Sequence, residues 1–375
     1  MQPKKWIWQH AHYPQFPYDP GAIVDSIGRI SYHIGRMNEI ISFLDRDAVV
    51  KVEVEAMTDE IVSSNEIEGA YLSRESVISS VKKAIDPTFD LSSDRSTHDT
   101  DSLVKILQDA ISNPELLTKE RIHSWHAALF PTGQSGLTRI KTGTYRTDEM
   151  EVVSNPYGRK KVHYIAPPSS LIDQQMNSLL DYVNHSEENP YIKSAKAHLW
   201  FVVIHPYDDG NGRLARVITD YILAKDAGLS YKYHSISTAI NIHKKEYYEI
   251  LEKSNNLIHN RTYDFTEWFT WHLEIHAKAI ENSICQTETI IKKAKLWDKI
   301  NTTSLNERQK KVLNKLANIG EDNFVGGLST KKYQAIAKTS RATAIRDIND
   351  LISKGFLKQV EGTAGRSIRY RFALL

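Results

Sequence analysis

The amino-acid sequence predicts a mainly α-helical protein with a smaller domain of helices and a β-hairpin at its C-terminal end. Over most of the 375 residues, apolar side chains recur every three or four positions, which is the spacing of an amphipathic helix. Strand-like patterns are confined to residues 151–168 and residues 356–372. A chain of this length corresponds to two or three domains.

The composition excludes several classes of protein. Hydrophobic residues make up 41% of the chain and charged residues 25%, which is ordinary for a soluble globular protein. No apolar run is long enough to cross a membrane, and the opening residues lack the apolar core of a signal peptide. The single cysteine, Cys285, excludes an internal disulfide and fits a reducing compartment. We therefore expect a cytoplasmic protein without a membrane partner.

Residues 1–98 are expected to form an N-terminal helical module. Prolines interrupt residues 6–20, which predicts an extended arm pinned to the body by its aromatic side chains. Helical spacing then predicts three helices, over residues 21–46, 48–67 and 74–85. Gly69 is placed to end the second helix and Ser73 to cap the third. Residues 86–98 are polar, contain a proline and predict a loop.

Residues 99–285 are expected to form the central domain. Five helices are predicted there in addition to the one that follows the motif described next, over residues 119–130, 171–183, 191–204, 242–251 and from 264 onward. Thr118 is the expected cap of the first of them. Two β-prone runs flank Asn155-Pro156-Tyr157-Gly158, which predicts a hairpin within residues 151–168.

The segment His205–Arg216 reads His-Pro-Tyr-Asp-Asp-Gly-Asn-Gly-Arg-Leu-Ala-Arg. Apolar runs precede and follow it, so it is predicted to be a tight polar loop between two buried helices. Removing so many polar groups from water is costly unless each finds a partner, and a ligand is the natural partner. Gly210 and Gly212 let the backbone turn sharply and approach that ligand closely. The free N–H groups at the start of the next helix form a seat for an anion.

Four further side chains of this segment suit phosphate chemistry. Arg213 and Arg216 share a helix face and can clamp phosphate oxygens. Asp209 is a hard oxygen ligand that suits Mg²⁺, and His205 belongs to the residue type that accepts a proton near neutral pH. Together they predict phosphoryl or nucleotidyl transfer to an incoming hydroxyl. The simpler alternative is a Gly-rich turn with solvated charges.

The segment resembles the signature of the Fic family, H-x-F-x-[DE]-G-N-G-R-x-x-R, with Tyr207 in place of Phe. Since that Phe is a core anchor, Tyr207 adds a hydroxyl that needs a partner. The resemblance implies a Fic-fold helical core in residues 99–285 that binds ATP and Mg²⁺. Such an enzyme transfers AMP to a Ser, Thr or Tyr hydroxyl of a target protein, itself included. A homodimer is also implied.

The resemblance assigns a role to each matching position. It makes His205 the catalytic base and Asp209 the Mg²⁺ ligand. The nucleotide's phosphates would be bound by the remaining matching residues: Gly210 and Gly212 as an anion hole, Asn211 as a contact, and Arg213 and Arg216 at the β- and γ-phosphates.

A second, shorter match lies upstream. Ser64-x-x-x-Glu68-Gly69 fits the family's inhibitory motif, [ST]-x-x-x-E-[GN], at the end of the predicted helix 48–67. A Glu68 carboxylate paired with Arg216 would occupy the place of the γ-phosphate. The resemblance therefore implies an autoinhibited enzyme. A solvated helix end is the alternative.

The predicted hairpin corresponds to the family's flap, which aligns a target peptide by adding it as a strand. Three residues are expected to bind the target there: Val162, His163 and Tyr164. Three basic residues near the turn favour an acidic target or simply keep the turn soluble: Arg159, Lys160 and Lys161.

The nucleotide itself is left open by these residues. Tyr248 could stack on adenine, although buried aromatic packing explains the Tyr247-Tyr248 pair equally well. The motif does not specify a nucleobase. Transfer of UMP, or removal of AMP, therefore remains an alternative chemistry at the same site.

The C-terminal part begins with a linker helix over residues 286–303. Residues 304–375 then predict helices over 305–316, 328–337 and 340–355 and strands over 356–360 and 367–372, an order that resembles a winged helix-turn-helix.

Residues 304–375 contain 14 Lys and Arg against 6 Asp and Glu, a net charge of +8, so the rest of the chain carries −6 of the total of +2. A basic module on an acidic body favours a DNA partner. The expected contacts are Arg341, Thr343, Arg346 and Arg366. Protein contact or dimerisation is the alternative use of this module. A DNA-binding regulator that senses nucleotide through its Fic body is the alternative function for the whole chain.

Overall fold

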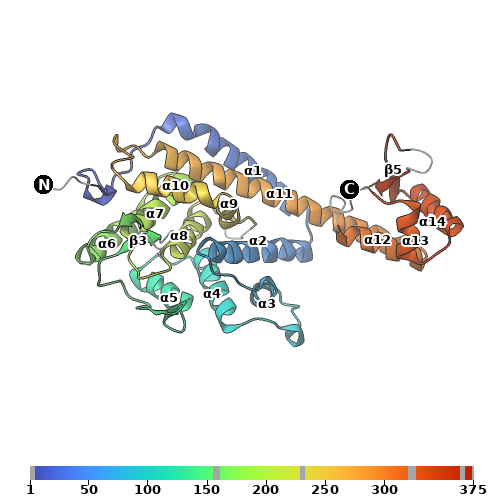
Figure 1. Ribbon diagram of the computed structural model, residues 1–375, viewed down its shortest axis with the longest axis horizontal. Helices are drawn as coiled ribbons and strands as arrows, with labels where there is room; N and C mark the ends of the chain where they lie inside the picture. The colour runs from blue at the N-terminus through green and yellow to red at the C-terminus, as the bar shows by residue number, and fades with distance from the viewer. Residues whose placement is uncertain (1–4, 155–160, 229–232, 320–326, 364–367, 374–375) are drawn as a thin grey trace. The chain divides into compact units, whose positions relative to one another are not determined.

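The computed structural model describes residues 5–154, 161–228, 233–319, 327–363 and 368–373 (Figure 1). The chain divides into two compact units, Met1–Ile284 and Cys285–Leu375. Helices dominate both units and the strands form only short hairpins, so the predicted mainly α class is confirmed. Within the described residues, no helix has the length and apolar character needed to cross a membrane.

The N-terminal helices follow the predicted apolar spacing. They are α1 (Val24–Ser42), α2 (Arg46–Ile67) and α3 (Arg74–Ile85). Helix α2 ends because Gly69 adopts a left-handed φ of 77°, and its N–H donates to the Glu66 carbonyl. Ser73 caps α3 by accepting from the N–H of Ser76. Glu68 is thereby held at the C-terminal end of α2.

The proline-containing arm before α1 is pinned to the body through its aromatic residues. It contains the 3₁₀ turn Ile7–Gln9, and Trp6 and Phe16 are each only 4% exposed. Trp6 forms a β-bridge with Asn256, and the Trp8 indole N–H donates to the Ile165 carbonyl. The arm therefore packs against β4 (Lys161–Ile165) of the hairpin at residues 151–165.

The central helices surround two that are almost wholly buried, α7 and α8. The helices of this region are α4 (His98–Ser112), α5 (Lys119–Leu129), α6 (Ile172–His185), α7 (Pro190–Ile204), α8 (Asn211–Asp226), α9 (Ile236–Ile242), α10 (Lys244–Asn255) and α11 (Thr266–Thr302). Phe201 on α7, Leu214 on α8 and Trp268 on α11 are inaccessible to solvent. Helix α9 was not predicted, because seven residues are too few to show a helical period.

Two hairpins lie on this helical body. The flap consists of β3 (Glu151–Ser154) and β4 (Lys161–Ile165), an antiparallel pair whose register shifts between Val152 and Val153. A second hairpin consists of β1 (Gln134–Ser135) and β2 (Thr138–Arg139). The prediction that the flap is the only strand pair before the C-terminal unit was therefore wrong. Two-residue strands leave no detectable alternation in a sequence.

The C-terminal unit contains α12 (Glu307–Ile319), α13 (Thr330–Ala337), α14 (Arg341–Ser353), β5 (Leu357–Gln359) and β6 (Tyr370–Phe372). The predicted linker is helical and forms the end of α11. Both strands are shorter than predicted, and Arg366 lies outside the described residues. A core of its own holds the unit together, including Val312, Tyr333, Leu351 and Phe356.

The end of α2 offers a direct test of backbone conformation. An added Cβ would meet no atom within 4 Å at either Gly69 or Gly35, but only Gly69 has a left-handed φ. We expect Gly69→Ala to destabilise the protein by about 1 kcal/mol. Gly35→Ala, within α1, should stabilise it by roughly 0.5–1 kcal/mol.

Thermal unfolding followed by circular dichroism measures both variants. Equal shifts in the same direction would show that the left-handed conformation at the end of α2 is not what favours glycine there.

Candidate functional site

The loop between α7 and α8 is shaped by two left-handed residues and one side-chain clamp. His205 has φ 50° and Gly210 has φ 79°. The Asn211 carboxamide accepts from the Tyr207 N–H at 3.0 Å and donates to the Tyr207 carbonyl at 2.8 Å. Because both ends of this amide are engaged and the residue is 2% exposed, its side chain holds the loop. The predicted contact of Asn211 with phosphate stays a prediction.

Tyr207 anchors the loop in the core, where its added hydroxyl has a partner. The residue is fully buried, and its hydroxyl lies 2.8 Å from His123 Nδ1. Its ring stacks on His126 with centroids 4.1 Å apart. His126 Nδ1 accepts from the Gly143 N–H, so Nε2 donates to the Asp209 carbonyl at 3.2 Å. The sequence had assigned neither histidine a role.

His205 is presented to the site as a neutral imidazole. Its Nδ1 lies 3.2 Å from the Val202 carbonyl, which can only accept, so Nδ1 carries the proton. The lone pair is therefore on Nε2, where a base needs it. Burial lowers the pKa of His205 to about 4, since the imidazolium would be desolvated.

Arg146 fixes the backbone of His205, a role that no sequence pattern had indicated. It is 2% exposed, and its Nε donates to the His205 carbonyl at 2.8 Å. Its other nitrogens donate to the carbonyls of Asp148 and Pro167, at 2.7 and 2.6 Å. One buried guanidinium thus ties the loop to the segments on both sides of the flap.

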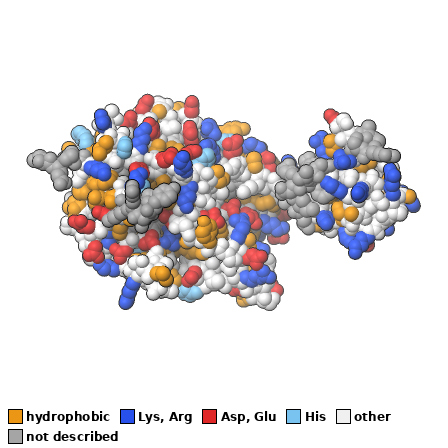
Figure 2. Space-filling view, in the orientation of Figure 1, with side chains coloured by type: hydrophobic (Ala, Val, Ile, Leu, Met, Phe, Trp, Pro, Cys, Tyr) orange, Lys and Arg blue, Asp and Glu red, His pale blue; other side chains and the backbone are white. Residues whose placement is uncertain are grey.

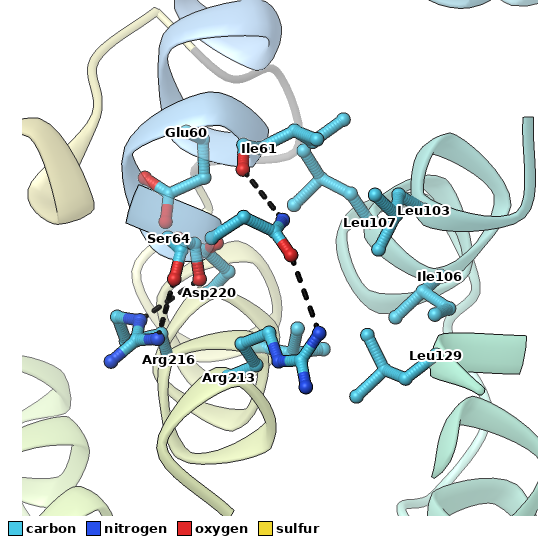
Figure 3. Close-up of a pocket in the computed structure, with 12 residues that line it drawn as sticks. Glu60, Ile61, Ser64, Leu103, Ile106, Leu107, Leu129, Arg213, Arg216 and Asp220 are labelled. Atoms are coloured by element: carbon cyan, nitrogen blue, oxygen red, sulfur yellow. Dashed lines mark hydrogen bonds between the residues drawn. The ribbon is translucent and has the colours of Figure 1, made fainter. Parts of the chain in front are cut away.

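Arg216 on α8 faces the end of α2. Its Nη2 lies 2.8 Å from Glu68 Oε1 and also donates to the Ser64 carbonyl, while Nε donates to Ser64 Oγ at 2.9 Å. Figure 3 shows Ser64 and Arg216 turned toward one another. Burial alone would lower the pKa of Arg216, but the Glu68 carboxylate outweighs it and the pKa is raised.

The Glu68 carboxylate lies directly against the N-terminal turn of α8. A Cβ built on Gly212 would be 2.2 Å from Glu68 Oε1 and 3.3 Å from Arg216 Nη1. That Nη1 atom has no hydrogen-bond partner among the described residues. The absence of a side chain at Gly212 therefore lets an anion approach the helix end, and the anion there is Glu68 itself.

Arg213 lies one turn before Arg216. Its Nη1 donates to Asn65 Oδ1 at 3.3 Å, and its guanidinium lies 4.6 Å from the centre of the Phe130 ring. Burial lowers its pKa. The end of α2 thus engages both predicted phosphate-binding arginines.

The Asp209 carboxylate would supply one oxygen ligand to Mg²⁺, and water or phosphate would supply most of the others. One oxygen accepts from the Gly210 N–H at 2.5 Å and the other accepts from Ser135 of the β1–β2 hairpin. Within the described ranges, no cluster of three or more His, Cys, Asp or Glu could hold a metal by itself. A single carboxylate at a phosphate seat is the usual way in which proteins bind Mg²⁺.

A cleft of about 630 Å³ opens beside these groups. Glu68, His205 and Gly212 line one side, and β3, β4 and α10 line the other. Tyr248 lines this cleft, is 44% exposed and donates its hydroxyl to the Ile67 carbonyl at 3.0 Å. Tyr247, 2% exposed, is the tyrosine of the pair that packs in the core.

The three predicted flap residues have different environments. Tyr164 is 4% exposed and donates its hydroxyl to the Val203 carbonyl at 2.6 Å, so its side chain anchors the flap. Val162 packs partly against the core. His163 lines the cleft, with Nδ1 2.9 Å from Glu252 Oε2, and Lys161 Nζ lies 3.3 Å from Oε1 of the same residue. The predictions for Arg159 and Lys160 lie outside the described residues.

Comparison with known proteins gives two kinds of match. Residues 116–223, which contain the loop, α7 and most of α8, match the model of the Fic/DOC family, and residues 6–86 match a domain of unknown function, DUF4172. A uridine 5'-monophosphate transferase of Xanthomonas campestris pv. campestris (strain 8004) is 26% identical over 117 residues. That match covers 29% of this chain, and the chain spans only 21% of the relative's length.

Solved structures show the same fold. A Fic family protein from Desulfovibrio desulfuricans G20 aligns with a TM-score of 0.57 at 20% identity, over 96% of this chain and 98% of that one. A Fic domain containing signaling protein from Bacteroides thetaiotaomicron VPI-5482 aligns with a TM-score of 0.51 at 18% identity, over 70% of this chain and 96% of that one. The fold is thus that of Fic proteins, and the loop with its flanking helices lies in a Fic/DOC family domain.

The environment of His205 predicts its titration. The buried imidazole should protonate near pH 4, well below the ordinary value of 6.5, and should remain neutral at physiological pH. An NMR titration of the histidine ring resonances measures this, with the His205→Ala spectrum identifying the signal. A midpoint near 6.5 would mean that the ring is hydrated and not held as described.

Proposed function

We propose that this chain is a protein nucleotidyltransferase that transfers AMP from ATP to a Ser, Thr or Tyr hydroxyl of a protein, its own included. The observation that carries the proposal is a cleft lined by His205, by Gly212 at the N-terminus of α8 and by Glu68, whose carboxylate pairs with the Arg216 guanidinium. The match of residues 116–223 to the Fic/DOC family supports it, as does a relative named as a nucleotide monophosphate transferase.

Each step of the proposed reaction is assigned to a group at the site. The target hydroxyl gives its proton to His205 Nε2 as its oxygen attacks the α-phosphorus. A new P–O bond forms, the bond to the β-phosphate oxygen breaks, and pyrophosphate leaves. Arg213, Arg216 and the N–H groups at the start of α8 stabilise the leaving charge. Mg²⁺ held by Asp209 would neutralise phosphate charge when bound.

The same geometry describes an inhibited resting state. Glu68 pairs with Arg216 and lies against Gly212, where the terminal phosphates of a nucleotide would otherwise bind. Two anions cannot share that position without strong repulsion. ATP must therefore displace Glu68 or bind in an unproductive pose.

Glu68 is held in place by more than its own ion pair, because α9 and α10 support the last turn of α2. Asn241 donates to the Glu66 carboxylate at 2.8 Å, and Lys244 donates to the Glu66 carbonyl at 3.0 Å. Tyr248 bonds the next carbonyl, that of Ile67. These contacts keep the inhibitory carboxylate at the phosphate seat.

The identity of the nucleotide is the open part of this proposal. The motif residues are assigned to proton transfer, Mg²⁺ and phosphates and none to a base, and the relative from Xanthomonas is named for UMP. UTP is therefore the first competitor to test against ATP. Removal of AMP from a modified protein uses the same groups with water in place of the hydroxyl.

Self-labelling tests the transferase directly. With ATP labelled at the α-phosphate and Mg²⁺, we expect strong labelling of Glu68→Gly, at least tenfold above wild type, because the phosphate seat is vacated and the barrier falls by ~1.4 kcal/mol or more. Adding His205→Ala to that variant should reduce labelling to background. Glu68→Gln, which keeps the size of the side chain and removes its charge, serves as the matched intermediate.

Parallel reactions with UTP decide the nucleotide. If no variant is labelled by either nucleotide while all variants retain their thermal unfolding transition, the chain is not a self-modifying transferase. Equal labelling of wild type and Glu68→Gly would leave the transferase intact and refute the inhibitory role of Glu68.

A further inference from the structure

The outward face of α14 in the C-terminal unit has an unusual composition. Its exposed residues follow helical spacing and are Arg341, Ala342, Ile345, Arg346, Asn349, Ile352 and Ser353. Every residue of α14 is described, and none of the exposed residues on this face is acidic. Ile345 is 42% exposed in the middle of it, although burying Ile345 would have favoured folding.

The acidic side chains of α14 are engaged by residues of the same unit. Asp347 is 5% exposed and accepts from Arg308 Nε at 2.9 Å and from the Tyr333 hydroxyl at 3.1 Å. Asp350 accepts from Gln309 and Lys354 at 2.7 and 2.6 Å. The negative charge of the helix is therefore paired, and the outward face presents cationic, amide, hydroxyl and aliphatic groups but no carboxylate.

The β5–β6 hairpin that follows α14 also exposes cationic side chains, which favour an anionic partner. Lys358 on β5 lies directly opposite Arg371 on β6, and both are exposed. Like charges at opposed positions destabilise an isolated hairpin, so an anion between them would relieve the repulsion. Residues 304–375 carry a net charge of +8. Figure 2 shows Lys and Arg side chains spread over the visible face of this unit.

We propose that α14 is a recognition helix that enters the major groove of duplex DNA, with the β5–β6 hairpin on the phosphate backbone. The side chains on its face match the groups displayed in that groove. Arginine pairs with guanine, asparagine with adenine, and alanine or isoleucine packs on the thymine methyl. Double-stranded RNA does not fit, because its major groove is too deep and narrow for a helix. The proposal is independent of the transferase activity.

The structure also revises the residues expected to touch DNA. Thr343 is half-buried and its hydroxyl lies 3.0 Å from Ser340 Oγ, so it belongs to the helix cap and not to the outward face. Ile345 and Asn349 take its place beside Arg341 and Arg346. The cap orients the first turn of α14, where base contacts are usually made.

Fluorescence anisotropy with the full-length protein tests this proposal. The probes are a labelled mixed-sequence DNA duplex, the RNA duplex of the same sequence, and the tightest duplex selected from a random DNA pool. We expect binding to DNA that weakens steeply with salt. On the selected duplex, Arg346→Ala and Asn349→Ala should each weaken binding about tenfold or more. Lys315→Ala, an exposed lysine of α12, is the matched control and should cost under about threefold.

Each other outcome overturns the proposal. Equal losses for Lys315→Ala and Arg346→Ala, or no selectable sequence, would mean that only general charge attraction acts. Equal affinity for the RNA duplex would exclude major-groove reading. Absence of DNA binding together with a change in sedimentation on Ile345→Ala would make this face a protein contact. His205→Ala should bind DNA like wild type, which separates this result from any failure of the transferase.

Discussion

The ion pair between Glu68 and Arg216 is the interaction on which the account of this protein depends. It joins the C-cap residue of α2 to a buried residue of α8. A carboxylate at the C-terminal end of its own helix is opposed by that helix's dipole, whereas the N-terminus of α8 attracts it. The attraction therefore comes from α8 and Arg216, the same groups that would attract a phosphate. In the proposed function, the Glu68–Arg216 contact and the contact of Arg216 with a nucleotide phosphate therefore exclude one another.

Arg216 and Glu68 differ in how much each loses when their ion pair breaks. Arg216 is 3% exposed and keeps two further bonds, to the hydroxyl and carbonyl of Ser64, if Glu68 leaves. Glu68 keeps 29% of its side-chain surface exposed and lies at a helix end. Removing one partner of a buried pair costs about 3–5 kcal/mol when the other charge is left alone. A phosphate that replaces the carboxylate pairs with Arg216 again, so exchange costs less than simple loss of Glu68.

Features that depend on a few neighbouring residues were predictable from the sequence. The motif loop, the stop at Gly69, and the caps Ser73 and Thr118 all lie where local rules place them. Features that depend on tertiary partners were not. Arg146 donates to the carbonyls of Asp148, Pro167 and His205. The last two are distant in the sequence, so no local pattern indicates these bonds. The inward orientation of the Tyr164 side chain was not predicted for the same reason, because strand alternation does not say which side of a flap faces the body.

The Asn211 side chain illustrates the limit of a motif. Its position within the signature suggested a ligand contact, and its two bonds to Tyr207 show that its side chain also shapes the loop. His205, Gly212 and Arg216 instead present to the cleft or to Glu68 the groups that the chemistry needs. The sequence spacing was enough to place the motif residues in one loop. The three-dimensional contacts were needed to show which side chains shape that loop and which face the cleft or Glu68.

Isothermal titration calorimetry of ATP and AMP against wild type and Glu68→Gln tests the central claim most directly. If Glu68 occupies the seat of the terminal phosphates, the substitution should tighten ATP binding about tenfold, or ~1.4 kcal/mol, and leave AMP almost unchanged. An equal change for both nucleotides, or none for ATP, would show that the Glu68 carboxylate and the terminal phosphates do not compete.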